Sequence, residues 1–440
     1  MGATTMTTTA IVGTVLFWAL FAFRYFRTIV SVYTFCTYKP KPIAANPRYT
    51  SADATVVIPT TFKTPGELMQ CVRRILLCDP AAVFIVTANA NVPLVKDCLA
   101  LHSLDNNSEK ITVLGVDKLN KRTQILKAMP EVNTAITILA DDDVFWPESF
   151  IDYMLAIFED PEVGAGGPRQ RVHRNDRPDF WNFLGISYLE RRVWNNCATN
   201  AIDGSISTLS GRTAFYRTEI LKSDEFEYYF THDTWRGKPL NSDDDKCLTR
   251  YVYSHGWKIV LQFDPRSTIE TTVEPDSGYL HQCMRWCRAH WRGNFIVMQN
   301  ETYWCSLKFW WGFYYIYLGQ FQTPALIIDG LLSLFLWLAV GGSPVAKDAF
   351  IALAAWIVFT KNLKMIPHFW RHPIDMRFIP IGIAFSYFHG FLNLYAAFSM
   401  QQTQWGSQNL TALAETRVER EEEIPFLKES VEEVKLTFPS

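Results

Sequence analysis

The sequence predicts an α/β fold, with a largely parallel sheet in the middle of the chain and membrane helices before and after it. Two patterns lead to this prediction. Four short runs rich in β-branched residues alternate with amphipathic segments between residues 54 and 158. Uncharged, apolar stretches flank this charged middle part of the 440-residue chain.

The alternation gives the order of the elements in the middle part. The expected strands are 54–59, 82–88, 110–116 and 135–140, and the expected helices are 67–77, 93–101, 119–128 and 148–158. Strands that alternate with helices favour a parallel sheet with right-handed crossovers. Ligands of such sheets bind outside the carboxyl ends of the strands, so the residues that follow each strand are candidates for a site.

The N-terminal stretch predicts a membrane anchor. Met1–Phe23 contains no charged residue, and Ile11–Phe23 is almost wholly apolar. A bilayer core takes ~20 apolar helical residues. A cleaved signal peptide is the alternative, but the charged segment that begins such peptides is missing. Basic residues start at Arg24 instead, so we expect the following domain to lie in the cytosol.

The chain becomes apolar again after residue 308. Trp and Tyr gather between residues 310 and 317, which is typical of a helix at the membrane interface. We expect a span at about 324–340 and a short second candidate at 349–360, whereas 378–400 either spans the membrane or lies on it. The expected divisions are an anchor with its basic flank at 1–48, a cytosolic domain at 49–292, interfacial helices at 293–323, a transmembrane region at 324–400 and a Trp-Gly segment with an acidic tail at 401–440.

Charge and cysteine content exclude several classes of protein. The formal net charge is -2, which gives no support for nucleic-acid binding. The nine cysteines show neither zinc spacing nor a disulfide framework, so reduced, structural thiols are expected.

An acidic triplet follows the fourth expected strand. Asp141, Asp142 and Asp143 come directly after the apolar run 136–140 and before Val-Phe-Trp. Adjacent carboxylates repel one another, and a hard divalent cation that also binds diphosphate oxygens would compensate them. The alternative is a solvated acidic turn, and the apolar residues on both sides make that less favourable.

Two further motifs occur later in the chain. The first is the pair Asp244-Asp245 at the start of an expected helix, where carboxylates are also ordinary capping residues. The second is Gln282-x-x-Arg285-Trp286, within a basic and aromatic helix that by spacing alone resembles any interfacial helix.

Taken in order, the three motifs resemble those of the processive family 2 glycosyltransferases. The likeness is greatest to hyaluronan synthases and to hyaluronan-synthase-like fungal transferases, while chitin and cellulose synthases are more distant. It runs from about Ala54 to Trp405. The resemblance implies a Rossmann-like nucleotide-sugar transferase domain of the GT-A type, with interfacial and transmembrane helices.

The resemblance also implies a donor site. Asp141 and Asp143 match the family's Asp-x-Asp, and would hold Mn²⁺ or Mg²⁺ on the diphosphate of the donor. Lys121 and Arg122 resemble the basic pair that meets the nucleotide in hyaluronan synthases, and two cations near a diphosphate are chemically sensible.

Catalytic and acceptor residues follow from the later motifs. By the resemblance, Asp245, next to Asp244, would be the general base that takes the proton of the acceptor hydroxyl during an inverting transfer. Arg285 would steady the departing diphosphate. Gln282 and Trp286 would meet the acceptor sugar.

Other segments match the family less closely. Ser210 and Gly211 lie in a run that resembles the acceptor-site segment. Family members usually carry an Asp after the second strand to hold uracil, where this chain has Asn89 as a possible substitute. Trp405 resembles the gating tryptophan, although Gln408 replaces the family's Arg.

These features predict an integral membrane enzyme, expected in the plasma membrane. It would transfer sugar from a nucleotide-sugar donor, with a UDP-sugar favoured, to a growing polysaccharide. It would then export the polysaccharide to the cell wall or surface. A glycan acceptor and the lipid bilayer are the expected partners, and a homo-oligomer is possible. The alternatives are a non-processive transferase that adds one sugar to a lipid or protein, and a non-catalytic membrane scaffold. No motif identifies the sugar or the linkage.

Overall fold

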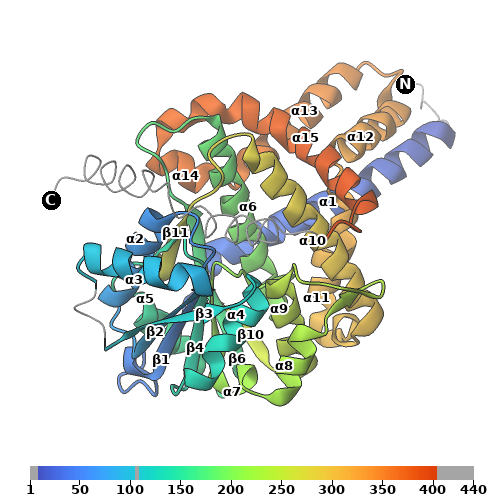
Figure 1. Cartoon of the computed structure of the whole chain (residues 1–440). Coiled ribbons are helices and arrows are strands. Elements are labelled where there is room, and N and C mark those ends of the chain that lie inside the picture. The colour runs from blue at the N-terminus through green and yellow to red at the C-terminus, as the bar shows by residue number, and fades with distance from the viewer. Residues whose placement is uncertain (1–7, 105–108, 404–440) are drawn as a thin grey trace. The chain divides into compact units, whose positions relative to one another are not determined.

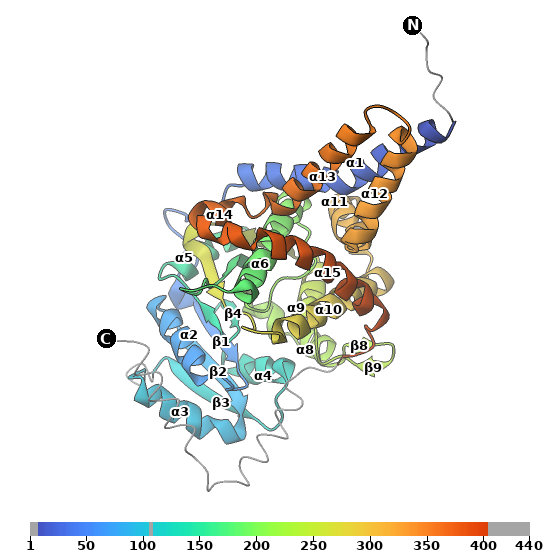
Figure 2. The same ribbon diagram turned by 90° about the horizontal axis from the view of Figure 1, so that it is seen from above.

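The computed structural model describes residues 8–104 and 109–403. These residues pack as two units, each assembled from separate stretches of the chain. The sheet unit consists of the described residues within 40–169 and 208–271, and the helical unit consists of 8–39, 170–207 and 272–402. Figures 1 and 2 show the elements of both units in two views.

The first half of the sheet unit confirms the predicted α/β order. Its parallel strands are β1 (Ala54–Pro59), β2 (Ala82–Ala88), β3 (Ile111–Val116) and β4 (Ile136–Ala140). They lie in the order β3-β2-β1-β4, and β1 pairs in parallel with both β2 and β4. The predicted and observed strands differ by at most one residue at either end, because each run is apolar and bounded by turn residues.

The second half of the sheet corrects the expectation of a parallel sheet. Strand β7 (Thr213–Arg217) lies between β4 and β6 (Val163–Val172) and runs antiparallel to both. Every residue of β7 is buried, as expected for a central strand covered on both faces. The remaining strands of this sheet are β5 (Val144–Phe145), β10 (Lys258–Gln262) and β11 (Thr268–Thr271). The sheet is therefore mixed, with nine strands among the described residues.

Helices cover both faces of the first four strands. The helices of the sheet unit are α2 (Pro65–Leu77), α3 (Val92–Leu101), α4 (Lys121–Ala128), α5 (Phe150–Leu155), α7 (Thr218–Leu221), α8 (Asp224–Thr231) and α9 (Asp244–Ser254). Figure 1 shows α2 and α3 on one side of the strands and α4 on the other. Helix α2 buries Leu68, Val72 and Ile75, a helical spacing, in the same core as β1 and β2.

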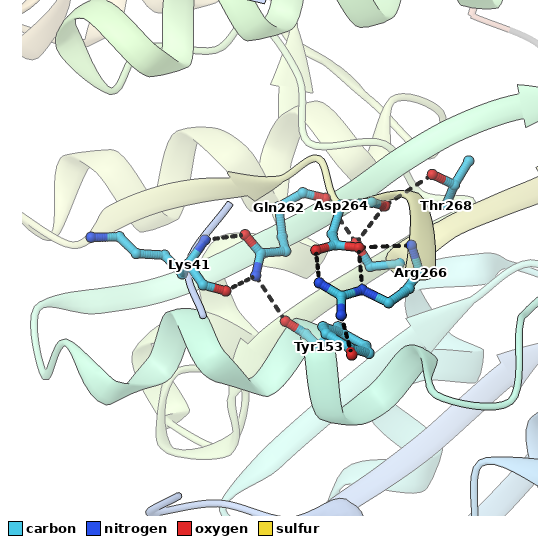
Figure 3. A network of polar contacts seen from close by, with 7 residues as sticks. Lys41, Tyr153, Gln262, Asp264, Arg266 and Thr268 are labelled. Carbon is cyan, nitrogen blue, oxygen red and sulfur yellow. Dashed lines mark hydrogen bonds and ion pairs between the residues drawn. The ribbon is translucent and has the colours of Figure 1, made fainter. Parts of the chain in front are cut away.

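A fully buried glutamine at the end of β10 fastens the segment that enters the sheet unit. The Gln262 side chain accepts from the backbone N–H of Lys41 at 2.9 Å and donates to the Lys41 carbonyl at 2.8 Å. It also donates to the carbonyl of Tyr153 at 2.9 Å. Figure 3 shows this side chain between the two backbone segments. One amide group thus satisfies backbone groups that regular sheet pairing does not reach.

The turn after β10 is held by an ion pair within three residues. Arg266 lies against both carboxylate oxygens of Asp264, with Nε and Nη2 at 2.8 and 2.7 Å, and covers the ring of Tyr153 (Figure 3). The Asp264 carbonyl also accepts from the Thr268 hydroxyl at 3.0 Å. The short hydrogen bonds to Arg266 lower the pKa of Asp264. This turn therefore positions β11, which pairs with β5 just after the acidic triplet.

The helical unit contains helices that range from three to thirty residues. They are α1 (Thr8–Thr37), α6 (Phe180–Asp203), α10 (Gly278–Asn300), α11 (Trp310–Gly312), α12 (Ala325–Val340), α13 (Ala346–Leu363), α14 (Ile366–Arg371) and α15 (Ile379–Phe398). Helix α1 packs along α12 and α6, and α10 packs along α15. An ion pair of 2.8 Å joins Arg24 of α1 to Asp329 of α12.

By length and composition, two described helices could cross a membrane, namely Thr8–Thr37 and the stretch Pro373–Phe398. A third candidate is Leu307–Gln322 together with Ala325–Val340, which bend by 86° at their junction. The expected span at 324–340 therefore qualifies only as half of a bent pair, because α12 alone has 16 residues. The expected candidate at 349–360 lies in α13, which is not among these helices.

The Gln262 bridge allows a test of the fold. We expect Gln262→Leu to lower the free energy of unfolding by about 2–4 kcal/mol, because buried backbone groups of Lys41 and Tyr153 lose their partners. Urea unfolding of the detergent-purified chain, followed by tryptophan fluorescence, measures this loss. The exposed Gln401 provides the control, since Gln401→Leu makes the same chemical change without removing a buried bridge. Equal stability of the two variants would contradict the structural role of Gln262.

Candidate active site

The acidic triplet lies at the carboxyl end of β4, where the ladder with β7 fixes its backbone. The N–H of Asp141 donates to the carbonyl of Arg212 at 2.9 Å, which continues the pairing of the two strands. Just beyond the triplet, the indole N–H of Trp146 donates to the Thr213 hydroxyl at 3.1 Å. The triplet thus follows β4 directly, in a half-buried turn.

The three carboxylates meet three different partners. Asp141 accepts from Lys121 Nζ at 2.6 Å, and Asp142 accepts a very short hydrogen bond from the Thr60 hydroxyl. Asp143 lies 3.5 Å from the hydroxyl of Thr271. Within the residues that the structure describes, no three acidic, His or Cys side chains converge on a ready-made metal cage.

Burial and neighbouring charges disfavour the charged forms of Asp142 and Asp143. Burial, together with the charge of Asp141, raises the pKa of Asp143 to about 7. Burial is also the largest cause of the raised pKa of Asp142, and the Thr60 hydroxyl opposes it. Two neighbouring carboxyl groups thus have raised pKa values. A positive charge added beside them would stabilise their ionised forms.

Lys121 joins the two acidic motifs. It is the first residue of α4, whose N-cap Asn120 accepts from the N–H of Arg122. Its ammonium lies 2.6 Å from Asp141 Oδ1 and 3.4 Å from Asp244 Oδ2. Burial alone would lower its pKa, but the charges of these carboxylates outweigh burial and raise it. Sequence positions more than a hundred residues apart therefore share one cation.

The second acidic pair occupies the first turn of α9. Asp243, the residue before the helix, has a left-handed backbone with φ of 62°, which is uncommon for a residue other than glycine. Asp244 and Asp245 follow, and a carboxylate oxygen of Asp245 accepts from the N–H of Lys246 at 2.8 Å. Negative side chains at a helix N-terminus are stabilised there by the helix dipole.

The segment that contains Ser210 and Gly211 lies against this cluster. A Cβ added to Gly211 would come within 2.9 Å of Lys121 Nζ and 3.6 Å of Asp245 Cβ. The neighbouring N–H of Leu209 donates to the Thr249 hydroxyl of α9 at 2.8 Å. Gly211 therefore leaves space beside the two acidic motifs that a side chain would fill.

Arg122 has a different place from the one expected of a nucleotide contact. It is buried, donates to the carbonyls of Phe230 at 2.6 Å and Ser242 at 2.9 Å, and pairs with Asp233 at 3.0 Å. Arg250 of α9 pairs with the other oxygen of Asp233 at 2.8 Å. These partners are internal, so the guanidinium fixes the segment that leads into Asp243.

An acidic residue that the sequence analysis missed lies beside Asn89. The Asn89 amide donates to Asp117 at 2.7 Å, and the two residues follow β2 and β3, which are neighbours in the sheet. A Cβ on Gly115 would lie 2.0 Å from Asn89 Oδ1, so only glycine lets this side chain cross β3. Asp117 comes directly after the predicted strand 110–116, so it falls under the expectation that residues following the strands are candidates for a site.

The third motif belongs to α10 of the helical unit. Trp286 stacks on Tyr188 of α6 with ring centroids 4.8 Å apart, and Arg285 is exposed. Gln282 accepts from the N–H of Glu274 at 3.5 Å. One face of the Trp286 ring is thus already covered by protein. Trp405 lies outside the described residues.

Known proteins share both the sequence and the fold. The profile of "Glycosyltransferase like family 2" matches residues 52–289. A "Type 2 glycosyltransferase" of Zymoseptoria tritici is 41% identical over 401 residues, which cover 89% of this chain and 84% of that protein. A "Hyaluronan synthase" of Streptococcus pyogenes is 21% identical over 274 residues, 62% of each chain.

A solved structure shows the same architecture at lower sequence identity. It is the mannosyltransferase PcManGT from Pyrobaculum calidifontis in complex with GDP-Man and Mn²⁺. The two structures have a TM-score of 0.51 and 16% sequence identity, and the match covers 90% of this chain and 100% of the other. The likeness shows the GT-A-like fold. The profile and the fungal relative show that this chain belongs to the family 2 glycosyltransferases, enzymes that transfer a sugar from a nucleotide-sugar donor.

Proposed function

We propose that the cluster of Asp141, Asp143, Lys121 and Asp245 carries out an inverting, metal-dependent sugar transfer. The observation that supports this most directly is the shared cation: Lys121 holds the carboxylate that follows β4 beside the one that begins α9. Such an arrangement supports a donor site close to the proposed base, at the carboxyl ends of the strands, where ligands of this fold class bind.

Asp141 and Asp143 would hold Mn²⁺ or Mg²⁺. Their hard oxygens suit either cation, and the raised pKa of Asp143, caused by burial and the neighbouring carboxylates, is a cost that a bound cation would remove. When bound, the metal supplies positive charge to the diphosphate. The Mn²⁺ in the mannosyltransferase complex supports this assignment. Lys121 adds a positive charge beside the carboxylate of Asp141.

Asp245 would act as the general base. In the proposed step, the acceptor hydroxyl oxygen bonds to the anomeric carbon while the bond from that carbon to the diphosphate oxygen breaks. The hydroxyl proton passes to the Asp245 carboxylate, and the electron pair of the broken bond leaves with the nucleoside diphosphate. The backbone of Gly211 lies beside Lys121 and Asp245, with Asp245 Cβ 3.6 Å from the position of an added Cβ, which supports an acceptor contact by the segment of Ser210 and Gly211.

The motif on α10 completes the proposed assignment. Arg285, which is exposed, would stabilise the departing diphosphate. Gln282 and Trp286 would contact the acceptor, for which the stacking on Tyr188 sets the orientation of the indole ring. Trp405 is retained as a gating residue. Arg122 acts in this proposal through its internal contacts, as a positioning residue for the segment before α9.

The donor base would lie over the ends of β2 and β3. Asp117 and Asn89 offer a carboxylate and a carboxamide there, linked by a hydrogen bond of 2.7 Å. The carboxylate is an acceptor for the imide N–H of uracil, the contact that an Asp after the second strand usually makes in the resembling family. This supports a UDP-sugar as the donor, with Asp117 in place of the missing residue.

For the product, we propose a polysaccharide made in the cytosol and moved across the plasma membrane to the cell wall or surface. The two candidate spans and the bent pair support a membrane position with the divisions given above, and the distant likeness to hyaluronan synthase supports processivity. A second candidate is transfer of a single sugar to a lipid or protein, because two or three spans are few for a channel without a homo-oligomer.

Asp245→Asn tests the assignment of Asp245 as the general base. We expect turnover to fall by about 10²–10⁴-fold, because the proton acceptor is lost, while donor binding stays within a few-fold. Release of UDP by the detergent-purified chain with Mn²⁺ and a panel of UDP- and GDP-sugars measures turnover, and product size decides processivity. The control is Asp224→Asn, an exposed carboxylate in the first turn of α8. Full turnover in Asp245→Asn would contradict the assignment.

Asp143→Asn tests the metal site. The variant lacks one of two proposed ligands, so we expect the Mn²⁺ concentration for half-maximal UDP release to rise about tenfold or more, in line with the loss of a carboxylate ligand. A chelator should abolish release by the unaltered chain. The exposed Asp152 of α5 supplies the control variant, Asp152→Asn. An unchanged Mn²⁺ dependence would remove Asp143 from the site.

Asp117→Asn tests the base pocket. An amide cannot replace the charged acceptor, and hydrogen bonds to charged groups contribute about 1.5–3 kcal/mol, so UDP affinity should fall by roughly 10–100-fold. Calorimetric titration with UDP and with GDP measures the change for each base. Asp97→Asn, on the exposed side of α3, is the matched control. If UDP affinity is the same in both variants, the uracil of the donor binds elsewhere.

A further inference from the structure

Five cations of the helical unit lie near one another, and two of them pair with the carboxylate of Asp329. Arg24 and Arg27 come from α1, Arg191 comes from α6, and Lys361 and Lys364 come from the end of α13 and the residue that follows it. Asp329 of α12 pairs with Arg24 at 2.8 Å and with Lys361 at 3.4 Å. The other three cations, Arg27, Arg191 and Lys364, form no ion pair with Asp329 in the described part of the chain.

Neutral groups link two of these three cations. Lys364 Nζ donates to the carboxamide oxygen of Asn195 at 2.5 Å, and the Tyr315 hydroxyl donates to the same oxygen at 2.8 Å. The guanidinium of Arg27 lies 5.5 Å from the centre of the Tyr315 ring. Lys364 and Arg27 therefore both lie beside the linked side chains of Asn195 and Tyr315.

The third cation belongs to the same group. Arg191 donates to the carbonyl of Lys361 at 3.0 Å, and Arg27 makes a long contact of 3.4 Å to the carbonyl of Gly319. Within residues 8–104 and 109–403, none of Arg27, Arg191 and Lys364 pairs with a carboxylate. Their acceptors are neutral oxygens, which leaves the positive charge uncompensated.

Two other cations of this unit, Arg174 and Arg371, are paired with carboxylates. Arg174 binds both oxygens of Asp375 at 2.8 and 2.9 Å, and Arg371 binds Glu190 at 2.7 Å. Asp375 and Glu190 are thus engaged elsewhere. Burial, followed by the charges of Arg27 and Arg191, lowers the pKa of Lys364 well below its usual value. The three unpaired cations therefore repel one another in partly buried positions, a cost that an anion would relieve.

The group also lies where an acyl chain would have apolar contacts. Phe26, Ile29 and Tyr33 form a stripe on α1 and are 51%, 60% and 65% exposed. Counted from Thr8 at 1.5 Å per residue, a hydrocarbon core of about 30 Å extends to about residue 27. Arg27 would then stand at the level of lipid phosphates, on the same helix as these apolar side chains.

We propose that Arg27, Arg191 and Lys364 form a binding site for the phosphate of an anionic phospholipid. Arginine forks and an ammonium group match the oxygens of a phosphate ester, and the apolar stripe of α1 suits the acyl chains. This site is separate from the residues proposed for sugar transfer, and it rests on the membrane position of α1 but not on the transfer chemistry.

Native mass spectrometry of the full chain tests the proposal. The purified protein is mixed in detergent with equal amounts of phosphatidylglycerol and phosphatidylcholine, and bound lipid is counted as lipid is diluted. We expect one phosphatidylglycerol to be retained at least tenfold more tightly than phosphatidylcholine. Equal retention of the two lipids would overturn the proposal, as would displacement of phosphatidylglycerol by inorganic phosphate or UDP, which would point to a soluble anion.

Variants assign the binding to these residues. Arg191→Gln and Lys364→Gln should each weaken phosphatidylglycerol retention about tenfold, without lowering the melting temperature in lipid-free detergent, because each removes a repelling charge. Lys347→Gln is the control, since Lys347 is exposed in the first turn of α13. Unchanged retention in both variants, or equal loss in the control, would contradict the site. Asp245→Asn should retain the lipid fully, which separates this test from that of the transferase.

Discussion

The ammonium of Lys121 is the contact on which the candidate site depends. It lies between Asp141 at the end of β4 and Asp244 at the start of α9, two carboxylates that would otherwise repel each other in a partly buried place. Its position is set by the first turn of α4, which Asn120 caps. The end of β4, the start of α4 and the start of α9 are distant in sequence but meet at the Lys121 ammonium. This contact sets the positions of the surrounding site residues.

Two adjacent residues of α4 make different contacts. Lys121 faces the acidic motifs, whereas Arg122 turns to the other side and holds Asp233 and the carbonyl of Ser242. Successive helical residues point about 100° apart, so two neighbouring cations rarely serve one ligand. Arg122 thereby supports the left-handed turn at Asp243 from which α9 begins, and the Asp244-Asp245 pair depends on that turn.

Charge is distributed differently in the helical unit. The Arg24–Asp329 ion pair joins α1 to α12, but carboxylates are fewer than cations around it. In the sheet unit the unbalanced charge is negative, at the acidic triplet, and it suits a cation with a diphosphate. In the helical unit it is positive, and it suits a phosphate. Each unit thus has a cluster in which one sign of charge predominates, and such clusters are candidates for ligand sites.

The sequence by itself determined the strands β1 to β4, the helices between them and the positions of the acidic motifs, because continuous apolar runs and turn residues are local signals. The tertiary structure decided the rest. Strand β7 has no alternating pattern, since it is buried on both faces, and its place between β4 and β6 made the sheet mixed. Asn89 and Asp117 are neighbours only because β2 and β3 pair, and Arg122 is internal only because α8 and α9 enclose it. Contacts between distant segments follow from packing, and no local pattern records them.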